Sequence, residues 1–178
     1  MELRLIEKNG ETILAICLHG RNRDSKLIEY HKKVMVDKFG LAINYIECPF
    51  PNLSHGFCAN KMVLDTIDTI KPTYYFFCDN DNIFLKKECF EIMYDAVKHK
   101  IGIWSAATQS NHKKGPNGQI PHPYASQASL CFPTELFDGL GRPDLDHWGV
   151  NGNNEFGGDT CERLTYAAKL NGYQVSLL

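Results

Sequence analysis

The chain has 178 residues, of which 43% are hydrophobic and 22% are charged, and its formal net charge at neutral pH is -2. This composition is typical of a globular protein, and the length suits one domain with a substantial core. The balanced charge gives no basic surface for nucleic acid or an anionic membrane, so we expect neither as a partner. The apolar runs are too short for a transmembrane segment, and the N-terminus lacks the apolar core of a signal peptide.

The chain contains seven cysteines, an odd number, and they are scattered without a C-x-x-C pair or zinc-finger spacing. Most of them lie inside apolar segments, where a cysteine behaves as a small buried hydrophobe. We therefore expect free thiols in a reducing compartment, which indicates a cytoplasmic location.

The first half of the chain alternates strands with helices. Continuous apolar runs predict strands at 12–18, 41–46, 74–78 and 101–107. Apolar residues at helical spacing predict three intervening helices, the first capped by Asp24 or Ser25 and ended by Gly40, the second starting near Ala59 and the third near Phe90. Strands separated by helices favour parallel pairing, so we predict a three-layer α/β/α sandwich with a mostly parallel central sheet.

The second half of the chain has longer polar segments. Residues 109–124 form a predicted loop rich in Gly, Pro and Asn, long enough to act as a functional lid. A short strand is predicted at 128–132, a second loop at 139–158, and a helix at 161–170 that ends at Asn171-Gly172. A last strand is predicted at 173–178.

The most informative motif is Asp79-Asn80-Asp81, which directly follows the apolar run Tyr74–Cys78. Open α/β sheets bind their ligands at the carboxyl ends of strands, where these two acids are expected to lie. Neighbouring carboxylates repel each other, and a Mg²⁺ or Mn²⁺ ion bound to phosphate oxygens relieves that repulsion. The alternative is a simple Asp/Asn turn between the strand and a helix starting near Lys86.

Several segments, taken in order, resemble motifs of the GT-A glycosyltransferases, particularly the family-2-like inverting enzymes that use nucleotide-diphospho-sugars. They are Gly20-Arg21-Asn22-Arg23 after the first strand, the Asp79-Asn80-Asp81 motif, Ser129–Phe137, Gly157-Gly158-Asp159 before a helix with Arg163-Leu164, and Gly172-Tyr173. The resemblance extends from about Ile13 to Val175 and implies a single GT-A-like domain over 1–178. It divides the domain into a nucleotide-sugar-binding half at 1–108 and an acceptor-side half at 109–178.

The resemblance implies a metal-dependent enzyme that moves a sugar, with inversion, from a UDP-sugar to a hydroxyl acceptor such as a glycan. Asp81 would bind Mn²⁺ or Mg²⁺ directly and Asp79 would contact the ion or the ribose. The expected donor pocket contains Arg21, Asn22, Arg23, Asn60 and Asn80. Asp159 is the expected general base, although with Glu162 it also fits a helix N-cap. On the acceptor side, Trp148 supplies an aromatic face for stacking on a sugar, beside Asp146.

The chain departs from the family pattern at three places. Gly158 replaces a Glu that commonly precedes Asp159, and only Glu47 stands near the position of an acid that contacts the base. Six residues follow Gly172, so a third metal ligand would be a loop histidine (His112, His122 or His147) or water. Two alternatives therefore stay open: a catalytically inactive GT-A-like domain that binds a nucleotide or glycan, and a sugar-nucleotide nucleotidyltransferase. The latter class normally has a Gly-rich loop after its first strand, where this chain has only Gly20.

Overall fold

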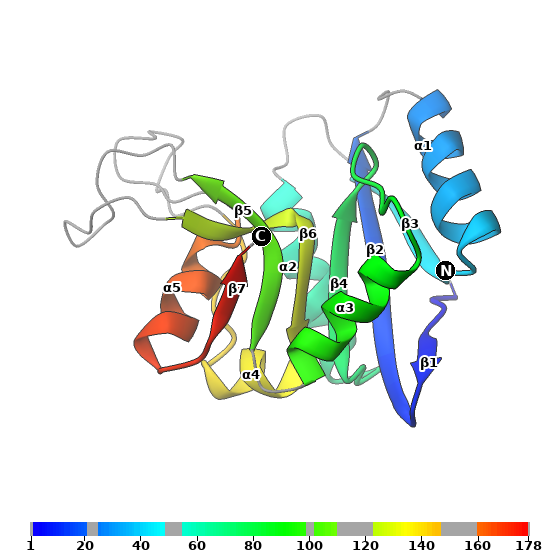
Figure 1. Ribbon diagram of the computed structural model, residues 1–178. Helices are drawn as coiled ribbons and strands as arrows, with labels where there is room; N and C mark the ends of the chain where they lie inside the picture. Colours follow the sequence, from blue (N-terminus) through cyan, green and yellow to red (C-terminus); the bar gives the residue numbers. More distant parts are fainter. Residues whose placement is uncertain are drawn as a thin grey trace.

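The computed structural model describes residues 2–20, 25–48, 55–98, 102–109, 123–146 and 160–177. Its strands are β1 (Ile6–Lys8), β2 (Glu11–Gly20), β3 (Ile43–Cys48), β4 (Tyr74–Asp79), β5 (Ile103–Gln109), β6 (Pro123–Pro133) and β7 (Val175–Leu177). Its helices are α1 (Ser25–Lys32), which continues into the π-helix η1 (Lys33–Lys38), then α2 (His55–Ile67), α3 (Glu88–Ala96), α4 (Thr134–Gly139) and α5 (Glu162–Leu170). Figure 1 shows these elements as a mixed α/β fold around one sheet.

The seven strands form a mixed sheet in the order β1-β2-β4-β6-β5-β7, and β3 pairs with β2 further along the same edge as β1. Pairing is parallel for β2–β3, β2–β4 and β5–β7 but antiparallel for β1–β2, β4–β6 and β5–β6. The prediction of a mostly parallel sheet is therefore wrong. The apolar pattern at 128–132 identified a strand but not its direction, which tertiary packing sets by inserting β6 between β4 and β5.

A short hairpin at the N-terminal side was not predicted. Its two strands, β1 and β2, are joined by Asn9-Gly10, and both residues have positive φ (53° and 79°). Asn-Gly is the preferred pair for a two-residue hairpin turn with positive φ at both positions, so the sequence did contain a usable signal. The hairpin covers the beginning of β2 and leaves its carboxyl half to β3.

The other elements agree with the predicted ones in type but differ in their bounds. The second helix begins at His55 and ends at Ile67, and the second strand runs from Ile43 to Cys48 rather than over 41–46. Gln109 belongs to β5, and Pro123 and Tyr124 begin β6. The rest of the predicted loop at 109–124 lies outside the described residues.

Helices cover both faces of the sheet, which agrees with the predicted three-layer arrangement. One hydrophobic cluster joins the sheet to η1 and α3, and the other joins it to α2, α4 and α5. Figure 1 shows α3 in front of the sheet and α2 behind it. Strand β2 serves both clusters, because Ile13, Ala15 and Cys17 point to one face while Leu14, Ile16 and Leu18 point to the other. Within the described ranges, no helix has the length and apolarity needed to cross a membrane.

Candidate functional site

The topology places a switch point of the sheet at the carboxyl ends of β2 and β4. From β2 the chain passes through α1 and η1 to β3 on one side, and from β3 it passes through α2 to β4 on the other side. The two connections cover opposite faces of the sheet. Such a reversal leaves a crevice outside the strand ends, which is where open α/β sheets bind their ligands. Asp79, the last residue of β4, lies at this point in register with Leu18.

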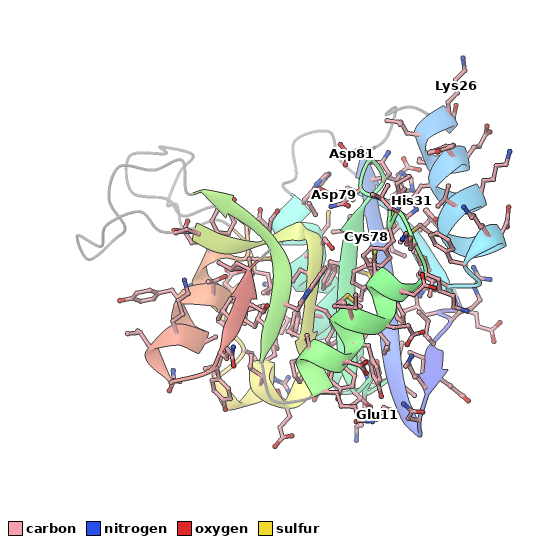
Figure 2. The ribbon with its side chains drawn as sticks, viewed as in Figure 1. Glu11, Lys26, His31, Cys78, Asp79 and Asp81 are labelled. Atoms are coloured by element: carbon pink, nitrogen blue, oxygen red, sulfur yellow. The ribbon has the colours of Figure 1, made fainter. Side chains whose placement is uncertain are left out.

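The Asp79-Asn80-Asp81 motif forms a tight turn here. The backbone N–H of Asn82 donates to the carbonyl oxygen of Asp79 at 3.1 Å, which closes the turn. Asp79 is largely buried, whereas Asp81 is exposed, and Figure 2 shows both side chains together where β4 ends. The motif thus forms the predicted turn, and that turn also places both carboxylates where they could bind one ion.

The two carboxylates have unequal electrostatic surroundings. Burial raises the pKa of Asp79, and the nearby negative charge of Asp81 raises it further. His55, the first residue of α2, opposes this effect, with its Nδ1 atom 3.7 Å from Oδ1 of Asp79. The pKa of Asp79 is still raised overall, so the ionised carboxylate is disfavoured in the folded chain. A cation bound by these oxygens would favour the ionised form.

His31 of α1 supports the turn from the side. Its Nε2 atom donates to the carbonyl oxygen of Asn82 at 3.1 Å, and its Nδ1 atom lies 2.7 Å from the hydroxyl of Tyr45. Burial lowers the pKa of His31, which keeps the ring neutral, so the hydroxyl of Tyr45 donates to Nδ1. His31 thereby ties α1 and β3 to the residue that follows Asp81.

On the α2 side of the crevice, the backbone of Leu145 and Asp146 packs against the first turn of α2. The Oδ1 atom of Asn60 accepts a hydrogen bond from the Leu145 N–H at 3.2 Å. The N–H of Asp146 donates to Oδ1 of Asp144 at 2.9 Å. In the structure the side-chain oxygen of Asn60 holds the chain at Leu145 against α2, and the predicted contact of Asn60 with the donor stays a prediction.

Asp146 and Asp79 lie near one buried thiol, that of Cys161. Burial raises the pKa of this thiol, and the charges of Asp79 and Asp146 add to the effect. The predicted acceptor-side residue Asp146 therefore shares its surroundings with the predicted metal ligand Asp79. The structure brings these two together with His55, which the sequence analysis did not single out.

The remaining predicted site residues lie outside the described residues. They are Arg21, Asn22, Arg23, Trp148 and Asp159, together with the loop histidines His112, His122 and His147. Their predicted roles in binding and catalysis stay predictions. The N-cap alternative for Asp159 is wrong, because α5 begins at Glu162 and its N-cap is Cys161.

His31 and His55 were not among the predicted site residues, because neither forms a histidine pair with the spacing of metal ligands. His31 follows Leu27 and Ile28 by about one helical turn and precedes Val34 and Met35 by another, so it lies on the apolar face of its helix. A titratable residue on the apolar face of a helix is unusual, and this position of His31 was the signal that could have identified it. His55 lies ahead of the apolar spacing that marked the helix, and its sequence context indicated no role.

An open apolar pocket of about 310 Å³ adjoins the turn. Its lining residues come from the turn, α3, β5 and β6: Asn82, Ile83, Phe84, Leu85, Cys89, Ile92, Trp104 and Ser129. Leu85 and Ile92 are both largely exposed. The turn therefore borders an apolar surface at Asn82, while Asp79 faces His55 of α2.

Comparisons with known proteins leave the family open. No protein-family model and no curated protein matches the chain. Among solved structures, 11 chains match. One is described as "Crystal Structure of A197 from STIV"; it is 8% identical with a TM-score of 0.42, and the match covers 70% of this chain and 66% of that one. The match thus spans just under two thirds of the length of A197.

Proposed function

We propose that the chain is a metal-dependent glycosyltransferase of the GT-A type that takes its sugar from a nucleotide-diphospho-sugar, with UDP as the expected nucleotide. The observation that carries this proposal is the pair Asp79 and Asp81, held in one turn at the switch point of the sheet. Carboxylate oxygens are the ligands that Mg²⁺ and Mn²⁺ prefer, and these ions are commonly shared with phosphate oxygens.

The surroundings of Asp79 fit a cation. Its pKa is raised by burial and by Asp81, which means that both carboxylates are ionised together only at a free-energy cost. A divalent ion offsets that cost, and when bound it would neutralise charge on the diphosphate leaving group. Asp81 is exposed and accessible to a ligand, while Asp79 is fixed by the end of β4.

The residues beside the turn have positioning roles in this proposal. His31 holds the carbonyl of Asn82 and so fixes the orientation of the turn. His55 opens α2 close to Asp79, where its imidazole and the positive end of the helix favour an anionic ligand. Asp146 lies on the acceptor side. Asp159 is proposed as the base that removes the acceptor proton, a role that rests on the family resemblance alone.

Calorimetric titration with UDP tests the donor site. We expect binding in Mn²⁺ that is lost in EDTA, and Asp81→Asn should weaken it on the order of tenfold or more. Asp95→Asn is the matched control, because it removes one exposed acid from α3 and should leave the affinity unchanged. Equal affinity for UDP with and without the ion, or in Asp81→Asn, would contradict the metal bridge.

Release of UDP from UDP-sugars separates an enzyme from an inactive binding domain. Asn has nearly the size and polarity of Asp but cannot take the acceptor proton, so Asp159→Asn should bind UDP normally and turn over on the order of a hundredfold more slowly. Metal-dependent UDP binding without any turnover by the wild type would favour the inactive domain. Normal turnover by Asp159→Asn would remove that residue from the mechanism.

A further inference from the structure

Three side chains form a row across strands β3, β2 and β4, one step behind the Asp79 turn. Cys17 of β2 is in register with Tyr45 of β3 on one side and with Cys78 of β4 on the other. Residues paired in parallel strands point to the same face of the sheet. All three therefore face the layer that contains α1, and they belong to or pack against the hydrophobic cluster on that face.

His31 of α1 completes this group. The two sulfur atoms of Cys17 and Cys78 and one ring nitrogen of His31 all lie within 4.8 Å of one another. Cys17 and His31 have no exposed surface and Cys78 has 2%. In a tetrahedral zinc site with sulfur and nitrogen ligands, the ligand atoms lie roughly 3.5 Å apart. A contraction of about 1 Å, within the reach of side-chain rotation, would bring the three atoms to that spacing. Figure 2 shows His31 and Cys78 beside the turn that carries Asp79.

The hydrogen bonds of His31 orient it as a metal ligand. Its Nε2–H is committed to the carbonyl oxygen of Asn82, at 3.1 Å. In the neutral ring Nδ1 then carries the lone pair. Without a metal ion this lone pair accepts a hydrogen bond from the hydroxyl of Tyr45 at 2.7 Å. Histidines that bind metal ions characteristically donate their other N–H to a carboxylate or a backbone carbonyl, which fixes the ring. Tyr45 is in register with Cys17 on the neighbouring strand, and its hydroxyl reaches Nδ1 of His31 from the same row of side chains.

We propose that Cys17, Cys78 and His31 bind one divalent ion of the zinc class, with the Tyr45 hydroxyl, which contacts Nδ1 of His31, as the ligand for a fourth position. The charges select the ion: two thiolates, a neutral imidazole and a divalent cation sum to zero, as a buried site among apolar side chains requires. Thiolate ligands favour zinc over magnesium or calcium, which prefer oxygen. Binding displaces the two thiol protons to solvent and involves no oxidation or reduction.

Such an ion would join three elements and support the turn. It would link α1 to β2 and β4, and the His31–Asn82 hydrogen bond would extend that link to the residue beside Asp81. This site is distinct from the proposed nucleotide site, whose ligands are the carboxylates of Asp79 and Asp81 in the turn itself. The thiolate site therefore stands or fails independently of the glycosyltransferase proposal.

Cobalt(II) titration of the reduced full-length chain tests the proposal, after the chain has been unfolded with chelator and refolded in the presence of the ion. We expect a sulfur-to-cobalt charge-transfer band and the intense visible bands of tetrahedral cobalt, both saturating at one ion per chain and removed by zinc. Cys17→Ser and Cys78→Ser should each abolish the charge-transfer band. Cys131→Ser should keep it, because Cys131 is a fully buried thiol in the same cluster but outside the proposed site.

The titration also separates this site from the carboxylate turn. Oxygen ligands give no sulfur-to-cobalt charge transfer, so Asp81→Asn should keep the band while binding UDP more weakly. A wild-type chain that refolds, judged by circular dichroism, without showing the band would overturn the proposal without reference to any variant. A band of full intensity in both Cys17→Ser and Cys78→Ser would overturn the ligand assignment.

Discussion

Gly56 is the residue whose size is most tightly constrained near the site. A Cβ atom at this position would lie 2.8 Å from the Cα and the Oδ1 atoms of Asp146 and 2.9 Å from the carbonyl oxygen of Leu145. Two of these atoms are backbone and cannot rotate away. The missing side chain therefore permits the 145–146 segment to pack against the first turn of α2, which brings Asp146 to the crevice.

We expect Gly56→Ala to destabilise the chain by about 1–3 kcal/mol, as other overpacking substitutions do. A glycine-to-alanine change inside a helix normally stabilises by about 0.5–1 kcal/mol, so the sign at Gly56 is reversed. Gly139→Ala in α4 is the matched control, because the nearest atom to its added Cβ is 3.7 Å away. Urea unfolding measures both variants. Equal free energies of unfolding for the two variants would show that the 145–146 segment moves aside at no cost in stability.

The residues of the site were only partly predictable. Asp79 and Asp81 follow a strongly apolar strand, and the position of strand ends is a local property, so their placement was accessible from the sequence. The pairing of His31 with Asn82 joins α1 to the end of β4, which depends on tertiary packing. The predicted role of Asn60 came from the family resemblance, and its hydrogen bond to Leu145 could not be predicted because it spans 85 positions.

A second polar cluster, centred on Glu11, connects β2, β4 and α3. It lies at the amino-terminal ends of β2 and β4, opposite the Asp79 turn at their carboxyl ends (Figure 2). The Tyr74 hydroxyl donates to Oε1 of Glu11 at 3.1 Å, and the Tyr94 hydroxyl donates to Oε2. The ammonium group of Lys98 lies 3.9 Å from Glu11 Oε2. The Glu11 carboxylate thus fastens the start of the central strand to its neighbours.

Tyr94→Phe removes one hydrogen bond to the Glu11 carboxylate. Hydrogen bonds to charged groups contribute about 1.5–3 kcal/mol, so we expect a loss of stability in that range by urea unfolding. Tyr30→Phe controls for the substitution, since Tyr30 is 55% exposed on α1 and the change should stay within about 0.5 kcal/mol. UDP affinity should be unaffected in both variants because the cluster lies at the opposite ends of the strands from the Asp79 turn. A stability of Tyr94→Phe equal to wild type would mean that solvent or Lys98 replaces the hydroxyl.

At the level of elements, the strands identified from the sequence are those with continuous apolar runs, and the helices are those with apolar residues at helical spacing. β2 and β4 are continuous apolar runs because both of their faces are covered by helices. The apolar end of β6 marked a strand, but β6 runs antiparallel to β4, and a residue pattern does not encode direction. β1 and β7 span three residues each and are too short for periodicity to mark their bounds.

Across the whole molecule, stability should decrease from the centre of the sheet to its edges. β4 is paired on both sides, with β2 and β6, and most of its residues are buried. β7 pairs only with β5 among the described strands, and its residues are half-buried. Amides of β2 and β4 should therefore exchange through global unfolding, and those of β7 through local opening at lower free energy.

Native-state hydrogen exchange followed by mass spectrometry or NMR measures this gradient. We expect the β4 amides to have the highest protection and the β7 amides to exchange at denaturant concentrations that leave β4 intact. Equal protection of β7 and β4 would mean that the sheet opens only as a single unit.

The position of β6 has a consequence for the way the chain is made. β4 is synthesised with its apolar residues Tyr74–Cys78 complete, but the strand that covers its second edge begins only at Pro123. At roughly 5–20 residues per second, translation leaves that edge without its partner for several seconds. An unpaired apolar strand edge is a template for association with other chains. A nascent or truncated chain that stops before β6 is therefore expected to need a chaperone to remain monomeric, although every residue of the Asp79 turn has already been made.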